Sequence, residues 1–140
     1  MPQVVGDDGV HVREPPDGDH YTFTSDESGR REVYVSRLSG GGKTIVSTSG
    51  GFDARWSRGG REIVYVSPDL RMMAVPVRTT PAMELGKPST LFATGSKRWT
   101  AFDVSPDGER FLVVIPEIVA GEQPLTAILN LQPPPVRSRN

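Results

Sequence analysis

The fold is decided by the stretch Phe102–Ile115, which reads FDVSPDGERFLVVI. Its centre, Pro106-Asp107-Gly108, is a turn sequence, because proline presets the backbone for a turn and glycine accepts the positive φ that tight turns need. A short mixed strand precedes this turn, and an apolar strand follows it. The stretch therefore predicts one β-hairpin.

The same hairpin pattern occurs twice earlier in the chain. The turns Pro16-Asp17-Gly18, Arg58-Gly59-Gly60 and Pro106-Asp107-Gly108 can be aligned, and their last glycines are 42 and 48 residues apart. This spacing is near the period of roughly 40–45 residues that is typical of four strands per propeller blade. Apolar residues come in short blocks rich in Val, Ile, Tyr and Phe, which indicates strands and not helices.

We therefore expect an all-β fold, a partial β-propeller of about three four-stranded antiparallel blades at residues 10–48, 50–94 and 98–131. Residues 1–9 form an N-terminal extension that can supply a closing strand. Residues 132–140 contain three consecutive prolines, which cannot donate to a ladder. The last blade is therefore expected to lack its outer strand, and the Pro-rich tail is expected to be flexible.

The second strand of each later blade predicts how the sheets pack. Ile63–Val66 and Phe111–Ile115 are apolar at every position. Because neighbouring residues of a strand point to opposite faces, both faces of these strands must be covered. Stacked propeller blades meet this condition, whereas a sandwich with one solvated face does not.

The chain contains five short motifs: 23–29 (FTSDESG), 54–57 (ARWS), 67–69 (SPD), 73–77 (MAVPV) and 102–108 (FDVSPDG). They resemble WD40-like (PD40) repeats of TolB-type β-propellers. The resemblance covers about Val10 to Leu131 and is closest to propeller segments at the C-terminal end of bacterial serine/threonine protein kinases. It implies a non-catalytic interaction or sensor module of a signalling protein. The alternative is the accessory propeller of an oligopeptidase-type hydrolase. Kinase and peptidase motifs are absent, and two turns depart from the Ser-Pro-Asp-Gly pattern.

Composition restricts the partners and cofactors. The chain has 16 basic and 17 acidic side chains, so the basic excess of a nucleic-acid-binding protein is missing. It has no cysteine, and no apolar run approaches the roughly 18 residues of a membrane span. We expect no cofactor, no metal and no enzymatic activity. No signal peptide is recognised at the start; the compartment is cytoplasmic as written, or periplasmic if the chain belongs to a larger exported protein.

Three patterns suggest chemistry but have simpler interpretations. Gly41-Gly42-Lys43-Thr44 resembles the end of a phosphate-binding loop, yet it lacks the earlier glycine and a following helix, so a hairpin turn is expected. No serine lies in a Gly-x-Ser-x-Gly elbow, and His11 and His20 are expected at the surface. The last pattern is a set of acidic residues that calcium would favour but whose spacing indicates solvated turns: Asp17, Asp19, Asp26 and Glu27.

The remaining ligand-binding candidates are Trp56, Trp99 and Asp103. Both tryptophans lie at inner strands, where they either line a central channel or pack between blades. Asp103 lies between Phe102 and Val104, and it is expected to point to the face opposite these two residues. An acidic group near the propeller axis would suit a cation or a substrate amine.

Three blades are too few for a closed ring, because propellers typically have 4–8. Two apolar blade faces are therefore expected to stay uncovered, which marks an interaction site. A protein or peptide partner is expected, and two copies in a homodimer would complete a six-bladed ring. Gln3-Val4-Val5 is a candidate for strand addition to the partner's last blade. The rival interpretation is a truncated reading frame of a longer propeller.

Overall fold

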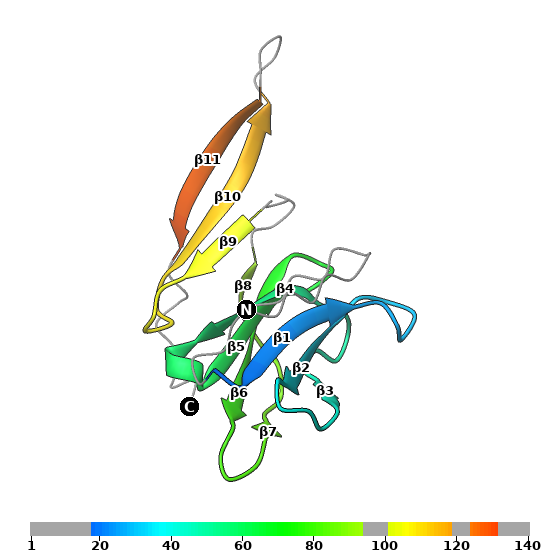
Figure 1. Ribbon diagram of the computed structural model, residues 1–140. Helices are drawn as coiled ribbons and strands as arrows, with labels where there is room; N and C mark the ends of the chain where they lie inside the picture. Colours follow the sequence, from blue (N-terminus) through cyan, green and yellow to red (C-terminus); the bar gives the residue numbers. More distant parts are fainter. Residues whose placement is uncertain (1–17, 94–100, 119–123, 132–140) are drawn as a thin grey trace.

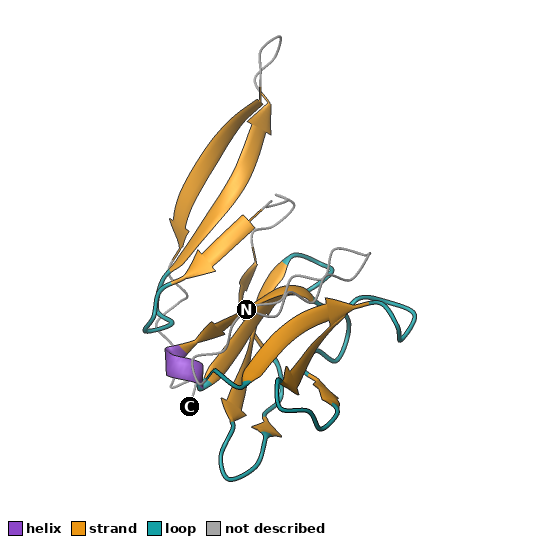
Figure 2. Cartoon of the chain, viewed as in Figure 1, coloured by secondary structure: helices purple, strands orange, loops and turns teal. Residues whose placement is uncertain are grey.

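The computed structural model describes residues 18–93, 101–118 and 124–131. Within these ranges the chain folds into antiparallel strands, and its only helical element is the 3-10 turn η1 (Arg58–Gly60), shown in Figure 2. The strands form three sheets that follow one another along the chain, here called blades 1, 2 and 3 (Figure 1). The all-β architecture expected from the repeated hairpins is confirmed.

Blade 1 contains β1 (His20–Ser25), β2 (Glu32–Arg37) and β3 (Lys43–Ile45), in that order across the sheet. Three glycines with positive φ, Gly40 to Gly42, lie in the connection from β2 to β3. The two strands then pair antiparallel, so the Gly-Gly-Lys-Thr stretch forms a hairpin connection, as predicted. The inner strand expected at residues 10–14 lies outside the described residues.

Blade 2 is the most complete sheet of the described chain. Its inner pair, β4 and β5, is joined by η1, and β6 follows on the other side of β5. The short β7 and the longer β8 both pair with β6, at opposite ends of that strand. The sequence predicted all of these strands except β7, which has only two residues. The bounds are β4 (Phe52–Ser57), β5 (Glu62–Val66), β6 (Arg71–Arg78), β7 (Glu84–Leu85) and β8 (Ser89–Ala93).

Blade 3 consists of β9 (Ala101–Val104), β10 (Phe111–Ile118) and β11 (Pro124–Leu131). The hairpin predicted at Phe102–Ile115 is formed by β9 and β10, joined by a turn in which Gly108 has φ 75°. Only the first half of β10 pairs with β9, whereas its whole length pairs with β11. As a result, β10 and β11 extend beyond β9 as a two-stranded ribbon (Figure 1).

The middle blade is packed on both faces. All five residues of β5 are buried. Ile63 and Tyr65 belong to a core shared with blade 1, whereas Val64 and Val66 belong to a second core shared with blade 3. This alternation follows from the twofold periodicity of a strand. The stacked arrangement predicted from the all-apolar second strands is therefore confirmed for blade 2.

Gly51 leads into β4 at a point where there is no room for a side chain. A Cβ atom at this position would lie 2.7 Å from Cδ2 of Tyr65 and 3.0 Å from Cβ of Ser47. We expect Gly51→Ala to lower the free energy of unfolding by roughly 1–3 kcal/mol, the usual cost of overpacking. Urea unfolding measures this. The same change at Gly86, where the nearest atoms are 3.0 Å away and belong to Pro76, is expected to cost less.

Candidate interaction surfaces

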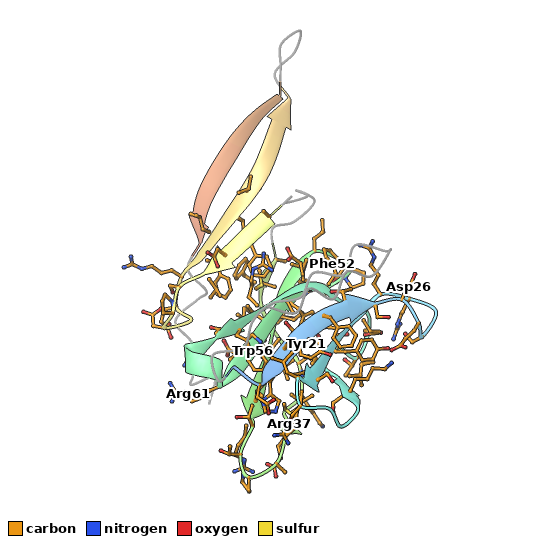
Figure 3. All side chains as sticks on the ribbon, in the orientation of Figure 1. Tyr21, Asp26, Arg37, Phe52, Trp56 and Arg61 are labelled. Carbon is orange, nitrogen blue, oxygen red and sulfur yellow. The ribbon has the colours of Figure 1, made fainter. Side chains whose placement is uncertain are left out.

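The sequence-derived candidates do not come together in one site. Trp56 packs against the core between blades 1 and 2, as in the packing interpretation. It lies at the opposite end of β4 from Phe52 (Figure 3). Asp103 is exposed, on the side of β9 opposite the buried Phe102, and its Oδ1 accepts a hydrogen bond from the Val104 N–H at 2.9 Å. Trp99 lies outside the described residues.

Two acidic residues of blade 1, Asp19 and Glu27, pair with cations of the same blade. Asp19 accepts a hydrogen bond from Nε of Arg37 at 2.9 Å, and this bond holds the pKa of Asp19 below its usual value. Glu27 forms an ion pair of 2.5 Å with Lys43. Among the residues that the structure describes, no three His, Cys, Asp or Glu side chains form a group able to hold a metal ion.

One expectation about this blade is wrong. His20 was expected at the surface but is buried, with 5% of its area exposed. It opens β1 opposite Arg37, on the same face as buried Thr22 and the core between blades 1 and 2. The polar character of this segment in the sequence gave no sign that one of its faces is covered.

The Ser-Pro-Asp motifs of the repeat are structural turns. In the turn before β6, Ser67 donates to Oδ1 of Asp69 and accepts from the Arg71 N–H. Ser105 and Asp107 repeat this arrangement in the turn before β10, with a distance of 2.6 Å between Ser105 Oγ and Asp107 Oδ1. These serine hydroxyls are the main reason that the pKa values of Asp69 and Asp107 are lowered. The motif thus fixes the hairpins and does not assemble a catalytic group.

Blades 2 and 3 are joined by contacts of two arginines of blade 2, one within β4 and one in the turn that follows it. Within β4, Arg55 pairs with Asp53 at 2.5 Å, and its guanidinium lies 4.9 Å from the ring centroid of Phe102 in β9. At the turns, Arg58 forms a 2.5 Å ion pair with Glu109. These contacts join blade 3 to blade 2 across 47 and 51 residues of sequence.

Blades 1 and 2 are joined by a buried carboxylate. Glu32 is 2% exposed and accepts hydrogen bonds from the hydroxyl of Ser47 and from the Gly50 N–H, the latter at 2.9 Å. Its other contact is an ion pair of 2.6 Å with Nε of Arg30. Because Ser47 and Gly50 lie in the connection between the two blades, Glu32 holds this connection against β2.

Tyr65 lies in the same junction, and its ionisation is suppressed. Burial, together with the negative charge of Glu32, raises the pKa of Tyr65 to about 12 from the usual 10.0 of a tyrosine. The native state therefore disfavours the phenolate, and the stability that depends on the neutral phenol is fully present below pH 10.

We expect this stability to be lost as the pH rises from about 10 through about 12. Relative to Tyr65→Phe, which cannot ionise, the wild-type chain should lose roughly 2–3 kcal/mol of unfolding free energy across this interval. Urea unfolding of both chains between pH 8 and 12 measures the difference. A difference that stays constant over the whole range would show that Tyr65 ionises equally in the folded and unfolded chain.

The outer face of blade 1 is rich in aromatic side chains. The ring of Phe23 stacks on Tyr34 with centroids 5.5 Å apart and contacts Tyr21 at 5.7 Å. Nζ of Lys43 lies 5.6 Å from the Tyr34 ring centroid, and Ile45, directly opposite Tyr34, is 47% exposed. We call these five residues the aromatic end face. They point away from blade 2, because Val33 and Val35 of β2 point toward it.

The outer face of blade 3 is mainly aliphatic. Phe111, Val113 and Ile115 of β10 are buried against blade 2, so Leu112 and Val114 point the other way. Leu112 is 45% exposed, and its partners in β9 place Ala101 and Asp103 on the same face. We call Ala101, Asp103, Leu112 and Val114 the aliphatic end face. Among the residues that the structure describes, no further blade packs on the outer face of blade 1 or of blade 3, although Tyr34 on the first of these faces is itself only 6% exposed.

Comparison with known proteins identifies the fold. No family model matches the sequence, and no curated protein sequence matches it. The structure is similar to that of TolB from Acinetobacter baumannii, with a TM-score of 0.59 and 20% identity over 86% of this chain. It is also similar to oligogalacturonate lyase from Vibrio parahaemolyticus, with a TM-score of 0.62 and 13% identity over 89% of this chain.

The chain spans 29% of the TolB chain and 38% of the lyase chain. No helix of the described residues has the length and apolar character needed to cross a membrane. The stacked blades, the repeated Ser-Pro-Asp turns and the two structural neighbours lead to one conclusion, that this chain folds as part of a TolB-like β-propeller.

Proposed function

We propose that the chain is a non-catalytic protein-interaction module of a signalling protein. The observation that supports it is the contrast between blades: both faces of blade 2 are buried, whereas blades 1 and 3 each present an outer face with a large exposed hydrophobic residue, Ile45 or Leu112. Exposed apolar sheet faces of this kind mark protein interaction sites. A protein or peptide partner, including a second copy that completes a six-bladed ring, suits such faces.

The described inner strands favour binding over catalysis. Their carboxylates are Asp53, which is paired with Arg55, and Asp103, which accepts from its own neighbouring backbone. Neither adjoins a histidine or a hydroxyl nucleophile in the contacts that the structure describes. The lyase neighbour is an enzyme, but a structure that is 13% identical in sequence supports only the fold of this chain and not a shared reaction.

The interaction is tested by photo-crosslinking with a photoreactive phenylalanine analogue. Positions 45 and 112 lie on the two end faces, and position 38 is a matched control because Leu38 is 46% exposed in the turn after β2. We expect protein adducts from positions 45 and 112 in the presence of the protein encoded with this chain, and few from position 38. Equal yields at all three positions would contradict the proposal.

The signalling role rests on the resemblance to kinase-linked propellers and is tested by the flanking coding sequence. A kinase domain with a membrane span in the same polypeptide or operon would support it. A hydrolase with a Gly-x-Ser-x-Gly elbow would favour the alternative, an accessory propeller of an oligopeptidase-type enzyme.

A further inference from the structure

A small polar cluster lies where the turn of blade 3 packs on the end of β4. Ser57 is the last residue of β4 and is 3% exposed, and its Oγ makes no hydrogen bond within the part of the chain that the structure describes. Nε of the next residue, Arg58, is likewise buried and without a hydrogen-bond partner there. Buried polar groups in folded proteins are nearly always satisfied, either by protein or by ordered water. These two atoms therefore require a partner that the neighbouring protein groups do not supply.

The two atoms converge on Gly108 of the Pro-Asp-Gly turn. The point at which a Cβ atom would stand on Gly108 lies 2.8 Å from Ser57 Oγ and 3.0 Å from Arg58 Nε. Both separations are in the range of hydrogen bonds, so the hydroxyl and the N–H group lie beside the same small region in front of this glycine. A side chain at position 108 would place carbon against both polar atoms, whereas glycine keeps carbon away from them.

The third side of the cluster is the carboxylate of Glu62, which is 1% exposed. Its Oε1 lies 3.7 Å from Arg58 Nε, which is within the range of an ion pair but beyond that of a direct N–H···O hydrogen bond. A polar contact longer than about 3.5 Å raises the question of a bridging water. The far end of the same guanidinium pairs with Glu109 of blade 3 at 2.5 Å, which holds the arginine toward the turn.

We propose that this cluster binds one water molecule, held by blade 2 and enclosed by the Gly108 turn of blade 3. The water oxygen accepts from the Arg58 Nε–H, and its two protons are donated to Glu62 Oε1 and Ser57 Oγ. Three hydrogen bonds are the usual number for a buried water. The guanidinium disfavours a cation at this point and the carboxylate disfavours an anion, so a small neutral ligand that both donates and accepts fits best.

Ser57→Ala tests the site, because the sign of its effect depends on the water. The Ser57 side chain does not cap η1, so the substitution removes no capping bond. With a bridging water, the loss of Oγ leaves the water short of one partner and raises the equilibrium constant of unfolding about 5–30-fold. A hydroxyl that is buried with no partner at all costs stability, so its removal would leave this constant unchanged or lower it.

Urea unfolding measures the change, and an exposed serine provides the matched control. Ser89 is exposed in β8, so Ser89→Ala reports the effect of the same substitution in a strand without the buried cluster. We expect Ser89→Ala to change the equilibrium constant of unfolding by less than about twofold. Circular dichroism confirms the β fold of both variants. A Ser57→Ala chain as stable as the wild type, or more stable, would overturn the proposal.

NMR detects the water directly at the Hε proton of Arg58 in the full chain. A long-lived buried water gives a dipolar cross-peak between Hε and the water resonance whose sign differs between laboratory-frame and rotating-frame experiments, whereas chemical exchange gives the same sign in both. We expect the dipolar cross-peak in the wild type, and Arg58→Lys, which lacks Nε, assigns it. Its absence from the wild type would overturn the proposal even if Ser57→Ala did not fold.

Discussion

Replacing Phe111 by alanine is expected to lower the free energy of unfolding by about 3–5 kcal/mol. Phe111 is 0% exposed and opens β10 in the core between blades 2 and 3. Its ring meets Phe92 of β8 edge to face, with centroids 5.2 Å apart. The substitution removes this aromatic contact and leaves a cavity at the point where the two blades meet, and both effects weaken the junction.

The neighbouring residue provides the matched control. Leu112 lies on the same strand but points to the outer face, where it is 45% exposed, so Leu112→Ala should cost under about 1 kcal/mol in a single molecule. Urea unfolding of both variants at the same protein concentration compares the two. Phe111→Leu, which keeps most of the volume, keeps the comparison measurable if the alanine variant does not fold. Equal costs at positions 111 and 112 would contradict the assignment of the two faces of β10.

Much of the fold could be predicted from the sequence because its strands are bounded by strong turn signals. Glycine pairs and Ser-Pro-Asp turns separate β4 from β5, β5 from β6 and β9 from β10, so the predicted bounds of β4 and β5 match the structure. The all-apolar pattern of Ile63–Val66 then required cover on both sides, which is the stacking observed. Local turn chemistry and twofold periodicity thus sufficed for the blades and their packing.

Features that depend on contacts between distant segments were not visible in the sequence. The contact of Arg55 with the Phe102 ring joins residues 47 positions apart, and no local pattern marks it. Asp53 has φ 55° at the point where the pairing of β4 with β5 shifts register. Aspartate adopts a positive φ more readily than most residues, but its presence in the sequence does not indicate a register shift. His20 was misplaced because its burial depends on the neighbouring blade.

The candidate surfaces, like the fold, could be predicted only in part from the sequence. The sequence predicted that two blade faces would be uncovered, because the number of blades follows from the count of turns. It did not predict which residues make those faces, since Tyr21 and Thr22 are adjacent in sequence and only the register of β1 on β2 decides which one points outward.

The buried carboxylate between blades 1 and 2 gives the second large effect. Glu32→Ala is expected to lower the free energy of unfolding by about 3–4 kcal/mol, because it leaves the Gly50 N–H and the Ser47 hydroxyl without their acceptor in a buried site. Ser47 also accepts from the Val33 N–H at 2.9 Å, so its displacement would disturb β2 as well. Urea unfolding measures the loss.

Two control variants, Glu84→Ala and Glu32→Gln, show whether the loss of stability comes from the charge of Glu32 or from its buried hydrogen bonds. Glu84→Ala breaks the pair with Arg78, in which both side chains are more than half exposed, and it should cost under about 1 kcal/mol. Glu32→Gln retains an acceptor for the Gly50 N–H but loses the charge that pairs with Arg30, so it should cost less than the alanine change. If Glu32→Gln and Glu32→Ala were equally destabilising, the charge on Glu32 would be what holds the two blades together, and not its hydrogen bonds to the connection between them.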